Sequence, residues 1–197
     1  MKFFLPLLLA LTTGAPRAWS TPPEREATQT NVAKDAATKA DAATVAENEN
    51  LIYSVFIYHF TKYVKWPADN RYSSGDFVIG VLGNTQMMSE LQKIAATKKV
   101  DDRQIVIRQY QSVGEIDDIC HMLYLPPGAS DEFENAEKKV RYASTLLITH
   151  RDGLGTAGSQ INFIKQEGKP RFELNEISMA KKQLRFAVAL KSIAVVL

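Results

Sequence analysis

The stretch that decides the fold is IYSVFIYHFTKYVKWP, residues 52–67. Its apolar side chains recur at helical spacing, which predicts a helix with one wide apolar face and a narrower polar one. The expected apolar face comprises Leu51, Ile52, Val55, Phe56, His59, Phe60, Tyr63 and Val64, and the expected polar face Ser54, Tyr58, Thr61, Lys62 and Lys65. Pro67 disfavours a helical conformation at Trp66, so the helix should end at about Lys65. Because the segment is too short and too polar at its end to span a bilayer, we expect a core helix packed against a sheet.

The first twenty residues have the pattern of a cleavable secretory signal peptide. Lys2 is followed by the apolar run 3–11, and Ala18 and Ser20 are small residues at the positions that a signal peptidase reads. Removing residues 1–20 takes away two basic residues and no acidic one, which brings the formal net charge from +2 to neutral. We therefore expect a soluble periplasmic protein without further membrane insertion, and nothing in its charge favours nucleic acid.

Residues 21–50 form the second part of the predicted organisation. They are rich in Ala, Thr, Lys and Glu, contain no aromatic residue, and cannot bury enough apolar surface to fold alone. We expect a flexible leader in which residues 32–49 could form a loose helix, because alanine is frequent there. The folded domain is then residues 51–197, which is long enough for one good core.

After Pro67, short apolar strands alternate with helices. The expected strands are residues 76–83, 103–110, 120–125 and 145–150. Three helices are expected between them: one that Asn84 caps, one over residues 112–119, and one that Ser130 caps. Residues 161–166 and 171–175 flank the turn EGKP and predict an antiparallel hairpin. Residues 176–183 should be helical, 184–190 extended, and 191–197 a helix or a buried tail. The order predicts the α/β class: a layered sandwich with a mostly parallel mixed sheet flanked by helices and an antiparallel hairpin near the C-terminus.

No catalytic constellation stands out in the sequence. His59, His121 and His150 are not joined by HxxxH or HxH spacing, so we expect no metal site and no cofactor. The single cysteine, Cys120, cannot form an intrachain disulfide, and its place in an apolar strand favours a structural side chain over a reactive thiol. We therefore expect no catalytic residue and no enzyme activity.

Two glycine-containing junctions and one arginine are candidate ligand-binding residues. Gly83 and Asn84 join a strand to a helix N-terminus, where free N–H groups can hold an anion. In the alternative interpretation, Gly83 only permits a tight turn. Asp152 and Gly153 begin a glycine-rich loop after a parallel strand, which is where open α/β sheets usually bind ligands. Alternatively, the loop is only a flexible connection into the hairpin. Arg171 could receive a carboxylate or phosphate, or belong to a solvated face. These residues support a periplasmic small-ligand-binding domain as the alternative function.

Several segments, in order along the chain, resemble the YfiR family of periplasmic regulators. They are FIYHFTKYVKWP (56–67), FVIGVLG (77–83), RQIVI (103–107), CHMLYL (120–125), TLLIT (145–149), Asp152 with its glycines, INF (161–163), and RFELN (171–175) leading to LRFAVALKSIAVVL (184–197). The resemblance covers residues 51–197, and it rests on the order and spacing of these segments.

The resemblance implies a non-enzymatic exported α/β domain that often dimerises. It implies a repressor that holds the periplasmic domain of an inner-membrane diguanylate cyclase inactive, which lowers cyclic di-GMP and biofilm formation. Relatives of this type can carry further cysteines in intrachain disulfides, whereas Cys120 stands alone here. A regulator of this kind needs an exposed apolar patch for its partner. We expect that patch at Tyr58, Tyr63 and Trp66 of the opening helix.

Overall fold

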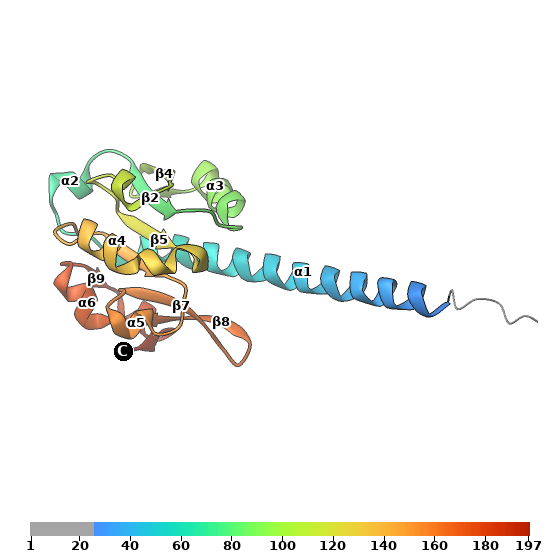
Figure 1. Cartoon of the computed structure of the whole chain (residues 1–197). Helices are drawn as coiled ribbons and strands as arrows, with labels where there is room; N and C mark the ends of the chain where they lie inside the picture. The colour runs from blue at the N-terminus through green and yellow to red at the C-terminus, as the bar shows by residue number, and fades with distance from the viewer. Residues whose placement is uncertain (1–25) are drawn as a thin grey trace, which may run out of the picture. The chain divides into compact units, whose positions relative to one another are not determined.

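The computed structural model describes the backbone of residues 26–197 and the side chains of residues 42–69 and 71–197 (Figure 1). The predicted signal, residues 1–20, and the start of the predicted leader lie outside the described residues. Helix α1 runs from Glu26 to Tyr63, so it includes the helix expected over residues 32–49. The folded domain comprises Ala42–Leu197.

The described part of the domain alternates strands with short helices. The strands are β1 (Val64–Lys65), β2 (Phe77–Leu82), β3 (Lys99–Val100), β4 (Arg103–Tyr110), β5 (Met122–Leu125), β6 (Leu146–Thr149), β7 (Ile161–Gln166), β8 (Lys169–Leu174), β9 (Arg185–Phe186) and β10 (Val195–Val196). After α1 the α-helices are α2 (Asn70–Ser73), α3 (Met88–Thr97), α4 (Phe133–Lys139), α5 (Leu154–Ala157), α6 (Glu176–Lys181) and α7 (Val188–Lys191), and the 3-10 helices are η1 (Val113–Glu115) and η2 (Pro127–Glu132).

An eight-stranded sheet in the order β10-β8-β7-β6-β5-β2-β4-β3 forms the centre of the domain. Strands β4, β2, β5, β6 and β7 pair in parallel, while β8 pairs antiparallel with β7 and β3 antiparallel with β4. The predicted mostly parallel α/β sandwich is therefore confirmed. The winding direction reverses between β2 and β5, because β4 lies on one side of β2 and β5, β6 and β7 lie on the other. A separate two-stranded sheet pairs β1 with β9.

The predicted hairpin is also confirmed. Strands β7 and β8 pair antiparallel with Phe163 opposite Phe172. The turn residues Glu167 and Gly168 both have positive φ angles, 53° and 72°, which is the conformation of a tight hairpin turn whose twist matches that of the strands.

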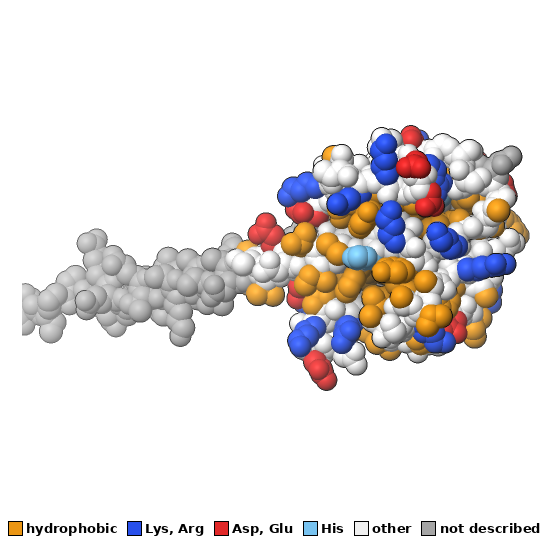
Figure 2. All heavy atoms as spheres, turned by 180° about the vertical axis from the view of Figure 1, so that it is seen from behind, with side chains coloured by type: hydrophobic (Ala, Val, Ile, Leu, Met, Phe, Trp, Pro, Cys, Tyr) orange, Lys and Arg blue, Asp and Glu red, His pale blue; other side chains and the backbone are white. Residues whose placement is uncertain are grey.

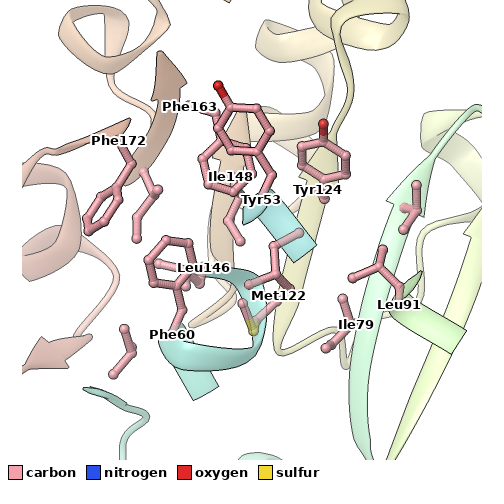
Figure 3. Packing of buried hydrophobic residues seen from close by; sticks show 14 of the residues in the cluster. Tyr53, Phe60, Ile79, Leu91, Met122, Tyr124, Leu146, Ile148, Phe163 and Phe172 are labelled. Carbon is pink, nitrogen blue, oxygen red and sulfur yellow. The ribbon is translucent and has the colours of Figure 1, made fainter. Parts of the chain in front are cut away.

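Two hydrophobic clusters fill the space on the two sides of the sheet. The α1-side cluster includes Tyr53, Ile57, Phe60, Ile79, Leu91, Met122, Ile148, Phe163 and Phe172, and the α4-side cluster includes Val78, Leu82, Cys120, Leu123, Phe133, Ala136, Val140 and Leu147. Figure 3 shows Tyr53 and Phe60 of α1 pointing into the first cluster, beside Phe163 and Phe172 of the hairpin. Side chains alternate between the two clusters along β2, β5 and β6, so these strands belong to both.

Helix α1 buries a face that only partly overlaps the predicted one: Phe60 and Val64 are buried as expected. The buried stripe is Tyr53, Ile57, Phe60 and Val64, whereas Leu51, Ile52, Val55 and His59, which were expected inside, are exposed. Ser54 and Thr61, expected outside, are buried, and their hydroxyls are satisfied by donating to the carbonyl oxygens of Leu51 and Tyr58 in the preceding turn, both at 2.7 Å. The helix also ends at Tyr63, two residues early, because residues 64–65 pair with β9.

Several local predictions outside α1 are wrong. The helix expected over 112–119 is only the three-residue 3-10 helix η1. Asn84 does not cap α3, which begins at Met88, because its side-chain oxygen accepts from Gln109 Nε2 instead. Ser130 does not cap a helix, since its hydroxyl donates to the Pro126 carbonyl oxygen within η2. The segment 184–190, expected to be extended, contains only the two-residue strand β9 before α7 begins.

Candidate functional site

The junction after β2 is held by the neighbouring strand. Gln109 Nε2 on β4 donates to the Gly83 carbonyl oxygen and to Asn84 Oδ1, both at 2.9 Å. The Gly83 N–H donates to the Tyr110 carbonyl oxygen at 2.7 Å, and Gly83 has φ +76°, which favours glycine. The side-chain oxygen of Asn84 is thus used within the fold, which supports the tight-turn interpretation of this junction.

The glycine-rich loop after β6 is tied to the hairpin by a polar network. Asn162 Oδ1 accepts from Thr149 Oγ1 at 2.8 Å, and Asn162 Nδ2 donates to Glu173 Oε2 at 2.8 Å. Asn175 Nδ2 donates to the Gly155 carbonyl oxygen at 2.8 Å. A side chain at Gly155 would collide with Glu173, so the loop packs directly against β8. Thr149 and Asn162 are fully buried within this network, whereas Arg171 is exposed and takes no part in it.

The five predicted ligand-binding residues lie on three separate elements. Gly83 and Asn84 follow β2, Asp152 and Gly153 follow β6, and Arg171 is exposed on β8. Strand β5 separates the first pair from the second, and β7 separates β6 from β8. Among the described residues, Arg171 makes no side-chain hydrogen bond or ion pair. The structure therefore does not bring these five residues together into one site.

An aromatic cluster lies between α1 and the ends of β5 and β6. Tyr124 Oη and His150 Nδ1 are 3.2 Å apart, and the ring of Tyr53 meets His150 edge-on with centroids 4.6 Å apart. Tyr53 Oη donates to the Ile164 carbonyl oxygen at 3.1 Å. Burial raises the pKa of Tyr53 to about 12 and lowers the pKa of His150. These shifts keep the phenol and the imidazole neutral, which suits a packing role better than proton transfer near neutral pH.

Cys120 is buried, and burial raises the pKa of its thiol to about 12. A neutral thiol with this pKa is a poor nucleophile, in keeping with a structural role. The described residues contain no group of three or more His, Cys, Asp or Glu side chains placed to hold a metal ion. No helix in the described part of the chain is long and apolar enough to cross a membrane.

The outward side of α1 carries an exposed apolar surface, which we call the outer face of α1 and define as Leu51, Ile52, Val55 and His59. Leu51 is 46% exposed, and Ile52 and Val55 are each 39% exposed. Figure 2, which shows the domain from behind the view of Figure 1, shows hydrophobic side chains gathered around a histidine and bordered by lysines and arginines. An apolar surface of this kind on a folded domain is typical of a protein-binding site.

Two of the three predicted partner-binding residues flank the outer face of α1. Tyr58 and Tyr63 are half-buried, and the rings of His59 and Tyr63 are stacked with centroids 6.1 Å apart. Lys62 lies 5.5 Å from the centre of the Tyr58 ring, and its Nζ donates to the Lys99 carbonyl oxygen at 3.0 Å. Tyr58, Tyr63 and the outer face of α1 therefore form one continuous surface along the helix.

Trp66 has a more internal place. Its Nε1 donates to the His121 carbonyl oxygen at 3.1 Å, and its ring meets Phe77 edge-on with centroids 5.0 Å apart. It is half-buried and fixes the segment that follows α1 against β2 and β5.

Sequence reasoning missed the outer face of α1 because it assigned those residues to the core. The spacing of Tyr53, Ile57 and Phe60, continued by Val64 just after the helix, gives a second stripe that the sequence interpretation did not consider. Two overlapping apolar stripes are present, and only the fold decides which one is buried.

The comparisons with known proteins identify a family. No curated protein matches the chain. Residues 50–195, which include all of the sheet except part of its last strand, match the family described as YfiR/HmsC-like. Because this match covers most of the sequence, the chain belongs to the YfiR/HmsC-like family.

Proposed function

We propose that this chain is a non-enzymatic periplasmic regulator that binds the periplasmic part of an inner-membrane diguanylate cyclase and thereby controls cyclic di-GMP output. Membership of the YfiR/HmsC-like family carries the proposal, because the family is one of periplasmic regulators rather than enzymes. The neutral tyrosine, histidine and cysteine side chains described above are in keeping with a binding role.

The contact surface that we propose for the cyclase is the outer face of α1 together with Tyr58 and Tyr63. Three aliphatic side chains of this face are exposed without a partner in the folded domain, and covering them would remove apolar surface from water. Tyrosines beside an aliphatic patch are typical of the centre of an interface. Trp66 supports this surface from behind by fixing the end of the helix.

The test compares the full-length wild-type chain with the Ile52→Asp and Val55→Asp variants, each expressed in a host strain whose own gene for this protein is deleted. A tagged chain is captured from detergent-solubilised membranes, its companions are identified by mass spectrometry, and cellular cyclic di-GMP is measured. Because both positions are partly exposed, each substitution should leave the fold intact. We expect both variants to lose the cyclase and to give the cyclic di-GMP level of the deletion strain, because a buried unpaired carboxylate opposes the apolar contact.

The matched control is Ile177→Asp, the same substitution at a residue of α6 that is 69% exposed and away from α1. It should retain the cyclase. Capture by the two α1 variants at the wild-type level would show that the surface is wrong. Absence of any cyclase with the wild-type chain, together with unchanged cyclic di-GMP in the deletion strain, would show that the function is wrong. If the variants convert a dimer to a monomer in light scattering but still capture the cyclase, the face joins two copies of the chain instead.

A further inference from the structure

Strand β4 has an open edge at one end of the eight-stranded sheet. The sheet ends in the order β2-β4-β3, and Figure 1 shows β4 at the end of the domain opposite β8. On its inner side, β4 pairs with β2 along residues 105–110. On its outer side, the two-residue strand β3 pairs only with Arg103 and Gln104. Among the described residues, no strand therefore pairs with the outer side of β4 beyond Gln104.

The outward backbone groups of this edge belong to Ile107 and Gln109. The Gly83 N–H donates to the Tyr110 carbonyl oxygen at 2.7 Å, so the backbone groups of Tyr110 face β2. Because successive residues of a strand direct their N–H and C=O groups to opposite sides, those of Gln109 point away from β2, and those of Ile107 do the same. Within the described part of the chain, nothing bonds to these outward groups. They are unused donors and acceptors on one edge.

The edge lacks the features that usually protect an open strand. Natural proteins block such edges with prolines, bulges, unpaired charges or very short strands. Residues 105–110 contain no proline, and their single charged residue, Arg108, forms an ion pair with Asp117. Val106 and Ile107 are only half-buried, so apolar surface lies along the same edge. At the other end of the sheet, β10 is only two residues long, which leaves little for another strand to pair with.

A second β4 fits this edge. Antiparallel pairing about a two-fold axis at Arg108 places Ile107 of each copy opposite Gln109 of the other, as hydrogen-bonded pairs. Every outward group of these residues then finds a partner. Val106 lies opposite Tyr110 of the second copy, an aliphatic–aromatic pair that favours strand association. The two Arg108 side chains come opposite each other, and the Asp117 carboxylate of each copy offsets their like charges.

We propose that two copies of this chain associate through β4, so that their sheets join edge to edge. The interface comprises one strand edge and the half-buried side chains beside it. Because interfaces of this size are at the small end of the specific range, the dimer should dissociate on dilution through about the micromolar range. This inference does not depend on the proposed function, because none of its residues belongs to the outer face of α1.

The first test compares the full chain with Gln109→Pro and Gln109→Ala, by light scattering at concentrations from well below to well above about 10 μM. Proline removes the outward N–H of residue 109, and its ring blocks the approach of the second strand, while the bonds to β2 are kept. Alanine keeps this N–H but, like proline, removes the side-chain bonds to Gly83 and Asn84. We expect the wild type and Gln109→Ala to dimerise with rising concentration and Gln109→Pro to stay monomeric.

The second test measures the register with introduced cysteines. Directly opposite residues of a non-hydrogen-bonded antiparallel pair have Cα atoms about 4.5 Å apart, which a disulfide can span. Mild oxidation with copper phenanthroline should therefore link two Arg108→Cys chains. The matched control is Gln104→Cys, also exposed on β4, whose two copies would lie about 27 Å apart across the axis and should stay unlinked. The buried Cys120 should leave the wild type unlinked.

The dimer and the proposed cyclase contact can fail separately. Ile52→Asp, on the outer face of α1, should dimerise as the wild type does even where it loses the cyclase. The proposal is overturned by a wild-type chain that stays monomeric well above about 100 μM, by a folded Gln109→Pro protein that dimerises, or by equal cross-linking of the two cysteine variants. If Gln109→Pro does not fold, the cysteine pair decides the question, because both of its substitutions are at exposed positions.

Discussion

His121 is a fully buried histidine whose neighbours determine its charge. Its Nδ1 accepts a hydrogen bond from the Val78 backbone N–H at 3.1 Å, so the neutral ring carries its proton on Nε2, 3.2 Å from the Tyr72 carbonyl oxygen. Arg103 Nη1 donates to the same carbonyl at 2.6 Å. Burial is the main cause that lowers the pKa of His121 to about 4; the Tyr72 carbonyl opposes the shift and the positive charge of Arg103 adds to it.

The low pKa of His121 predicts that the domain loses stability in mild acid. In the unfolded chain this histidine titrates near 6.5, so the stabilisation by its neutral form is fully present above pH 6.5 and is lost as the pH falls towards 4. The loss amounts to up to about 3 kcal/mol in the free energy of unfolding. Urea denaturation of the full chain at a series of pH values between 7 and 4 measures it.

His121→Asn provides the comparison, because its side-chain oxygen can accept from the Val78 N–H without carrying a titrating group. This variant should be less stable at pH 7 but should depend less steeply on pH. His59→Gln, a change at an exposed histidine, should keep the wild-type slope. An unchanged slope in His121→Asn would assign the acid sensitivity to other groups, of which half-buried His150 is the first to examine.

At the scale of elements, the central strand β2 depends on a glycine for close packing. A Cβ at Gly80 would lie 2.6 Å from Tyr110 Cε2 and 2.9 Å from Cys120 Sγ, both on packed neighbours. We predict that Gly80→Ala destabilises the domain by about 1–3 kcal/mol through overpacking. Gly128→Ala is the matched control, because nothing lies within 4 Å of its Cβ position. Equal stability of the two variants in urea denaturation would show that β2 can shift to make room.

The elements that could be predicted from sequence are those specified by local pattern. The continuous apolar run of β2 and the turn at Glu167 and Gly168 require little tertiary information, and both were found. The predicted cap at Asn84 failed because its partner, Gln109, is supplied only by the fold, and the cap at Ser130 failed because its hydroxyl donates to the Pro126 carbonyl oxygen within η2. The two-residue strands β1 and β9 carry no periodic signal, since their pairing joins segments about 120 residues apart.

The same limit applies to the candidate sites. Glycine-rich junctions are visible in sequence, but the bonds that fill them, such as that from Asn162 to Glu173, are set by strand order. The exposed face of α1 was hidden by a second apolar stripe on the same helix.

At the scale of the whole molecule, the sheet joins the two hydrophobic clusters into one cooperative unit. Neighbouring residues of β6, Leu147 and Ile148, face the α4-side and α1-side clusters respectively, and β2 and β5 alternate in the same way. Loss of packing on either side should therefore lower the stability of both. We predict that Leu147→Ala and Ile57→Ala, both at fully buried positions, each cost about 2–5 kcal/mol.

Trp66 packs beside the α1-side cluster. The other tryptophan, Trp19, lies in the predicted signal, so the fluorescence of a Trp19→Phe protein comes from Trp66 whether or not the signal is removed, and it tests whether the α1 side senses damage on the α4 side. We expect Leu147→Ala to shift the guanidinium midpoint seen by Trp66 about as far as Ile57→Ala does, with one transition and an unchanged slope. A midpoint that moves for Ile57→Ala but not for Leu147→Ala would mean that the two sides unfold separately. The strands shared by both clusters make the single transition the expected result, because neither side can lose its packing without disturbing β2, β5 and β6.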